Sequence, residues 1–264
     1  MHLFNSIILG VIQGATEFIP VSSSGHLIIF RDILGFKGAN DLSFDAVLQL
    51  ATVLAVIVYF YKDIWRIIVS FLKMVFLKAT EQKEKNLIFA IIIGTIPAII
   101  TGFLLESYMD TTFRNAKLVA VVLILGSMVF YLAEKFGKQK SEISVKKGLW
   151  IGLFQCLALV PGFSRSGATI SGGLFNGLNR ENATRFSFLL SVPIILGSGL
   201  KKLLDIYQSG ALGNVGPDLF VGSITAFIVG LVVIHFLIKY LKTHSLNIFG
   251  LYRILLAILI LIFV

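Results

Sequence analysis

The sequence predicts an all-α polytopic membrane protein, an inverted-topology repeat of six transmembrane helices and two re-entrant helix-loop-helix hairpins. First, the 264-residue chain is 56% hydrophobic and only 14% charged, whereas soluble domains carry about 25% charged residues. Second, residues 8–29 and 150–171 repeat one pattern, an apolar run interrupted by a proline and a serine-glycine turn. Third, the basic residues gather on alternate connections between apolar segments, as in membrane proteins.

Residues 3–34 are expected to form the first re-entrant hairpin, because Pro20 and the run Ser22-Ser23-Ser24-Gly25 interrupt their apolar sequence. Irregular backbone at membrane depth is tolerated only where protein encloses it or where it lines a cavity. The alternative is an ordinary spanning helix with a kink. The N-terminus has no basic segment or small-residue cleavage site, so we expect it to be retained.

A single integral membrane domain, 1–264, is expected, with a first half at 1–135 and an inverted second half at 148–264. Gln13 aligns with Gln155 when the halves are superimposed, and at a slightly shorter offset 94–102 matches 222–230. Residues 148–180 form the second expected hairpin. The expected spans have close to the ~20 apolar residues that cross a bilayer: 44–62, 87–105, 116–135, 185–201, 218–239 and 247–264.

The positive charge indicates the topology. Of the 23 lysines and arginines, six lie in 62–86 and five in 134–147, which places these two segments in the cytoplasm. Both termini then lie outside. The three spans between the two hairpins take the chain from one side of the membrane to the other, so the hairpins open to opposite faces. Nothing groups the charge on one surface, which argues against nucleic acid as a partner. The single Cys156 excludes an intrachain disulfide.

The two serine-glycine turns predict an anion site near the middle of the bilayer. Each turn precedes an apolar helix, whose free N–H groups and positive dipole end bind phosphate. Helix N-capping is the alternative role for the serines. The residues expected to bind phosphate are Ser22, Ser24, Gly25, Ser164, Ser166, Gly167 and Thr169.

Arg165 and Glu17 are ionisable residues near the middle of the two hairpins, where a charged side chain is costly and is expected to have a function. An arginine at membrane depth must face a partner or water, and its guanidinium fork suits two phosphate oxygens. Glu17 shares a helix face with Gln13, at i and i+4, and its expected roles are general base or metal ligand. A structural ion pair between Glu17 and Arg165 is the alternative, and it is compatible with a phosphate arriving beside them.

Two further residues complete the expected catalytic set. His26 follows the first turn directly, where an imidazole could protonate a leaving phosphate or attack phosphorus. The alternative is a hydrogen-bonded structural histidine. Ser23 or an activated water is the expected nucleophile. Gln13 and Gln155 are expected to support the site.

At these residues the chain resembles the bacterial undecaprenyl-diphosphate phosphatases. The stretches QGATEFIPVSSSGH (13–26) and PGFSRSGATISGG (161–173) look like the two signature motifs of that family, and the likeness spans nearly the whole chain. The resemblance implies hydrolysis of undecaprenyl diphosphate to undecaprenyl phosphate, which recycles the cell-wall lipid carrier and confers bacitracin resistance.

The resemblance also assigns the site. It implies main roles for Glu17, Ser23, His26 and Arg165, a stimulating divalent cation (Mg²⁺ or Ca²⁺), and a site opening to the outer face of the bacterial cell membrane. Gln13 stands where some members have glutamate, which weakens a metal site built on two glutamates. Phosphatidic-acid-type phosphatases share a Ser-Gly-His turn, but their Lys-x6-Arg-Pro and His-x3-Asp motifs are missing here.

The expected partners are the polyprenyl diphosphate substrate and the lipid bilayer. A transporter that flips a polyprenyl phosphate is the rival function, because inverted repeats with broken helices are typical of carriers. The sequence leaves open the nucleophile, the metal requirement, the isoprenoid length and the oligomeric state, with a homodimer among the options.

Overall fold

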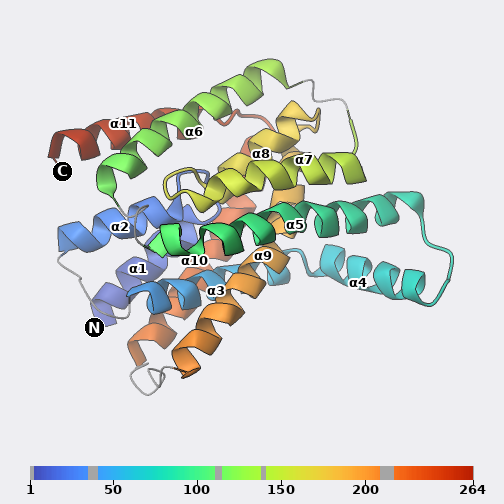
Figure 1. Ribbon diagram of the computed structural model, residues 1–264, viewed down its shortest axis with the longest axis horizontal. Coiled ribbons are helices and arrows are strands. Elements are labelled where there is room, and N and C mark those ends of the chain that lie inside the picture. Colours follow the sequence, from blue (N-terminus) through green and yellow to red (C-terminus); the bar gives the residue numbers. More distant parts are fainter. Residues whose placement is uncertain (1–2, 35–40, 111–114, 138–140, 209–216, 264) are drawn as a thin grey trace.

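The computed structural model describes residues 3–34, 41–110, 115–137, 141–208 and 217–263, and over these residues it is helical without strands (Figure 1). In chain order the elements are α1 Leu3–Thr16, α2 Ser23–Leu34, α3 Asp41–Tyr59, α4 Tyr61–Val75, α5 Gln82–Asp110, α6 Ala116–Phe136, α7 Val145–Cys156, a 3₁₀ turn Leu157–Leu159, α8 Arg165–Phe175, α9 Arg180–Gln208, α10 Pro217–Leu241 and α11 Asn247–Phe263.

Four of the described helices are long and apolar enough to cross a membrane: α5, α6, α9 and α10. Helices α3 and α4 count as a fifth span only when taken together, and they are bent by 81°. Helix α11 has 17 residues, about 25 Å at 1.5 Å per residue, against a hydrocarbon core of about 30 Å. The predicted multi-pass helical architecture is confirmed at this level, and a helix lies at each of the six expected spans.

The sequence predicted one span at 44–62, followed by a basic connecting segment. The structure instead has two helices there, α3 and α4. Helix α3 ends at Tyr59, Phe60 adopts a non-helical backbone, and α4 continues in a new direction. Its basic residues Lys62, Arg66 and Lys73 fall on one flank of the helix. The stretch therefore resembles a charged loop in composition although its apolar residues have helical spacing.

The two broken hairpins have the same turn. Ser22 and Ser164 occupy equivalent places in the two halves, and both have left-handed backbones, with φ of 76° and 75°. In each, the side-chain oxygen accepts a hydrogen bond from the backbone N–H three residues on, at Gly25 or Gly167. A left-handed backbone costs a non-glycine residue about 1–2 kcal/mol, so surrounding contacts must hold both serines in place.

Each hairpin packs on a long helix of the other half. Helix α1 packs on α10, and α7 packs on α5. Gly10 of α1 lies against the Gly222 carbonyl, and Gly152 of α7 lies against the Gly94 carbonyl. Gly10 and Gly152 occupy equivalent places in the repeat, as do Gly94 and Gly222, so the same glycine contact occurs twice. Small residues allow this close approach of helix backbones within a bilayer.

We predict that Gly152→Ala and Gly10→Ala destabilise the protein by similar amounts, about 1–3 kcal/mol, as overpacking does. A Cβ at either position would overlap a backbone carbonyl that cannot move aside. Thermal unfolding in detergent measures the effect. Gly197→Ala is the matched control, because nothing lies within 4 Å of its Cβ and alanine favours a helix. Two glycine variants as stable as the control would contradict this packing.

Candidate functional site

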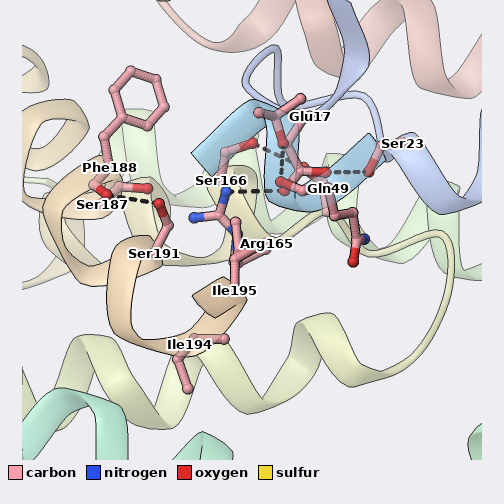
Figure 2. Close-up of polar contacts among 12 residues, drawn as sticks. Glu17, Ser23, Gln49, Arg165, Ser166, Ser187, Phe188, Ser191, Ile194 and Ile195 are labelled. Atoms are coloured by element: carbon pink, nitrogen blue, oxygen red, sulfur yellow. Dashed lines mark hydrogen bonds and ion pairs between the residues drawn. The ribbon is translucent and has the colours of Figure 1, made fainter. Parts of the chain in front are cut away.

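Glu17 is the centre of a buried polar cluster. It follows α1 directly and its residue is 7% exposed. Its Oε2 accepts hydrogen bonds from the Gln13 amide at 3.0 Å and the Ser23 hydroxyl at 2.8 Å, and its Oε1 accepts from Arg165 Nη2 at 3.1 Å (Figure 2). The cluster therefore joins the first hairpin to the second. The Glu17–Arg165 ion pair, which was the alternative to ligand binding and is compatible with it, is present.

Arg165 begins α8 and has capacity for a further ligand. Its Nη2 pairs with Glu17, but its buried Nε and Nη1 have no hydrogen-bond partner among the described residues. The buried Oε1 of Gln13 has none either. Buried polar atoms of native proteins are nearly always hydrogen-bonded, and an unused guanidinium edge matches a phosphate or carboxylate. The cluster thus has hydrogen-bonding capacity for a further polar ligand.

The helix starts supply further donors beside Arg165. Ser22 and Ser164 act as N-caps, so the capping alternative holds for these two side chains. The backbone N–H groups of Ser23 and Ser24 in α2, and of Arg165 and Ser166 in α8, make no hydrogen bond among the described residues. Two helix N-termini with free N–H groups therefore lie next to a cationic side chain, as an anion site requires.

Arg253, on α11, ties the two turns together. It is fully buried and donates to the carbonyls of Pro20 in the first turn and of Gly162 and Phe163 in the second, at 2.8–3.3 Å. It also donates to the Leu123 carbonyl. A direct bond from the Gly162 N–H to the Ser22 hydroxyl, at 3.2 Å, completes this link.

His26 lies outside the Glu17 cluster. Its Nδ1 is 2.8 Å from the Ser22 carbonyl and its Nε2 is 2.8 Å from the Tyr252 hydroxyl. Because a carbonyl only accepts, Nδ1 carries the proton and, in the neutral ring, Nε2 accepts from Tyr252. The structure thus gives His26 a structural link to α11 and no hydrogen bond to Glu17 or Arg165.

The remaining predicted residues take supporting places. The Thr169 hydroxyl faces its own helix and the Ser187 hydroxyl of α9, at 2.5 Å. The Ser24 and Ser166 hydroxyls pair with the N-caps Ser22 and Ser164. Gln155 is 2% exposed and neither of its amide atoms has a partner in the described part of the chain. It does not join the Glu17 cluster, unlike its repeat counterpart Gln13.

Sequence reasoning missed Arg253 and Tyr252. The signal for Arg253 was present, because it is the single charge within the expected span 247–264, and an ionisable residue inside a span is by default functional. Tyr252 gave no such signal, since tyrosines are common near membrane interfaces.

The site carries an excess of positive charge and fits a resident metal poorly. Arg165 pairs with the Glu17 carboxylate, whereas Arg253 donates to loop carbonyls and adds a second positive charge near the turns. The described residues contain no group of three His, Cys, Asp or Glu side chains that could hold a metal ion. Both oxygens of Glu17 already accept hydrogen bonds, and divalent cations need several oxygen ligands. The arrangement suits an anionic ligand.

Comparison with known proteins gives a consistent result. The family model described as "Bacitracin resistance protein BacA" matches residues 6–259. The chain is 47% identical to Undecaprenyl-diphosphatase 1 of Corynebacterium jeikeium, over 96% of this chain and 92% of that protein. It is 44% identical to the undecaprenyl-diphosphatase of Mycolicibacterium smegmatis, over 99% and 96% of the two chains.

We predict that Arg253→Met and Gly126→Ala both lower the thermal unfolding midpoint by several degrees. The first change leaves buried loop carbonyls without a donor, which costs about 1–3 kcal/mol. The second places a Cβ where the Arg253 guanidinium lies.

Gly250→Ala, at the same α6–α11 interface, is the control, because its Cβ would make ordinary contacts at 3.7 Å and beyond. The link through Arg253 would be refuted if Gly126→Ala were no less stable than Gly250→Ala.

Proposed function

The chain belongs to the bacitracin resistance protein BacA family, and we propose that it hydrolyses undecaprenyl diphosphate to undecaprenyl phosphate and inorganic phosphate. The reaction returns the cell-wall lipid carrier to its monophosphate form and so confers resistance to bacitracin. The observation that carries this proposal is the unpartnered guanidinium edge of Arg165 beside the Ser23–Glu17 hydrogen bond. It combines a phosphate-binding group, a nucleophile and a base in one cluster.

The terminal phosphate binds at Arg165 and at the two helix starts. Nε and Nη1 of Arg165 donate to its oxygens, together with the free N–H groups of Ser23, Ser24 and Ser166. The excess positive charge of Arg253 favours the diphosphate without touching it. These donors are fixed before the substrate arrives, so they can stabilise the charge that develops on the transferred phosphoryl group.

Ser23 attacks the terminal phosphorus while its proton passes to Oε2 of Glu17, 2.8 Å away. The bond from phosphorus to the bridging oxygen breaks, and undecaprenyl phosphate leaves with the electron pair. Water then displaces the serine oxygen from phosphorus and releases inorganic phosphate. Attack by a water that Glu17 activates gives the same products in one step. The Ser23–Glu17 contact favours the serine route.

Gln13 and Arg165 hold the Glu17 carboxylate in position for this proton transfer. His26 holds the first turn through the Ser22 carbonyl and Tyr252. A divalent cation would arrive with the diphosphate, since Mg²⁺ is commonly bound by one or two carboxylates together with substrate phosphates.

In the membrane, the chain is arranged as an inverted-topology repeat of six spans and two re-entrant hairpins. The paired glycine contacts of α1 with α10 and of α7 with α5 support this arrangement, and so do the matching turns at Ser22 and Ser164. The basic segments 62–86 and 134–147 lie in the cytoplasm, both termini lie outside, and the site opens to the outer face of the bacterial cell membrane.

Purified protein in detergent should release phosphate from undecaprenyl diphosphate, and Arg165→Ala and Glu17→Ala should each lower kcat/KM by about 10²-fold or more. The exposed Lys146→Gln serves as the control. An assay with and without chelator tests the cation. Wild-type rates in the Arg165 or Glu17 variant would refute the assignment, and lipid movement across liposomes without phosphate release would favour a transporter.

Ser23→Ala should reduce the rate of phosphate release by about 10²–10⁴-fold, because it removes the attacking oxygen. Ser223→Ala on α10 is the control, since its hydroxyl bonds only within its own helix. A radiolabelled terminal phosphate should remain on the wild-type protein after rapid acid quenching. Near-normal turnover in Ser23→Ala would exclude the serine as nucleophile and leave the water route.

A further inference from the structure

Helix α4 turns its polar side toward the protein and its apolar side outward. Asp63 pairs with Arg185 of α9 at 2.7 Å, and the Ser70 hydroxyl donates to Glu84 of α5. Large apolar side chains of the helix are 45–67% exposed: Tyr61, Trp65, Ile68, Leu72 and Val75. A surface helix in water has the opposite orientation, with its apolar face on the core. The exposed face of α4 is therefore suited to a non-aqueous environment.

The basic side chains of α4 border this apolar face. At 100° per residue, Lys62, Arg66 and Lys73 fall within about 40° of one another, next to the arc that holds Trp65 and Leu72. All three basic residues are exposed. The one acidic residue of α4, Asp63, lies on the protein side and is paired there. The exposed flank of α4 thus carries three basic residues and no acidic residue of the helix itself, although Arg66 also lines a pocket with Glu81 and Glu84.

The direction of α4 is set by a well-packed bend. Helix α3 turns into α4 through 81° at Phe60, which is 2% exposed. The Arg185 guanidinium lies 5.5 Å from the centre of the Phe60 ring and also pairs with Asp63. Because α3 lies at an expected span, a turn of 81° directs α4 away from the axis of that span.

We propose that α4 is an interfacial helix that binds the surface of an anionic phospholipid bilayer. Its apolar face enters the boundary between headgroups and acyl chains, and Lys62, Arg66 and Lys73 bind lipid phosphate groups. Basic side chains beside an apolar face extend toward headgroups in this way. An acidic protein partner would complement the charge but would leave Trp65, Ile68 and Leu72 against a polar surface. The bilayer complements both features.

The depth of Trp65 tests the orientation. Trp65 and Trp150 are the two tryptophans of the chain, so Trp150→Phe leaves Trp65 as the single tryptophan, whose fluorescence can be excited selectively at the red edge of the absorption band. In nanodiscs, quenching should be strongest with bromines near the top of the acyl chains and weak with aqueous acrylamide. Strongest quenching at the chain ends would mean that α4 spans the bilayer. Strong acrylamide quenching would mean that it lies in water. Either result overturns the proposal.

Lipid preference tests the charge. In the same Trp150→Phe background, energy transfer from Trp65 to labelled lipids measures which lipids surround α4. The local concentration of phosphatidylglycerol should exceed that of phosphatidylcholine by about fivefold, since each basic residue adds to anionic lipid binding. Lys62→Gln, Arg66→Gln and Lys73→Gln together should abolish the preference.

Replacing the exposed Lys117, Lys135 and Lys146 by glutamine removes the same charge elsewhere and should preserve the enrichment. Equal loss in both triple variants, or no enrichment in the parent, would overturn the proposal. Monodispersity in detergent confirms that each variant is folded. Neither readout requires phosphate release, so a failure here is distinguishable from a failure of the proposed hydrolysis.

Discussion

The arrangement of the whole site depends on one buried cation that holds two irregular turns together. Arg253 contributes no ion pair in the described structure and instead donates to carbonyls of both turns. Irregular backbone inside a bilayer leaves carbonyls that water cannot reach, and a guanidinium with five donors can satisfy several at once. The neighbouring sequence accommodates it. Gly126 leaves room for its Nη2, and the Phe130 ring lies 4.6 Å from its central carbon.

This link explains how strained residues persist at the site. Ser22 and Ser164 have left-handed backbones, and both lie within two residues of a carbonyl that Arg253 binds. The same buried guanidinium therefore supports both turns.

The sequence predicted the structure best where the internal repeat or the membrane environment limits which residue types a position can hold. Spans such as 116–135 follow from hydropathy. The cost of an ionised group at membrane depth predicts that Arg165 faces a partner or water, and the structure shows that Glu17 is a partner. The sequence did not reveal the Tyr252 partner of His26, because contacts between residues 226 positions apart depend on packing. Helix α4 was missed because its basic flank resembles a loop in composition, while its direction depends on Phe60 and Arg185.

The repeat gives two matching turns, but the chemistry lies in the positions where the halves differ. Ser23 and Arg165 occupy equivalent places, as do Glu17 and Leu159. If both halves kept a serine and a glutamate, two carboxylates would repel an anionic ligand. If both halves kept the arginine and the leucine of the second half, no carboxylate would be present to take a proton. In the proposed reaction, this divergence places the nucleophile and the base on one turn and the phosphate-binding cation on the other. The matched scaffold then brings these unlike groups within hydrogen-bond distance across a single ligand site.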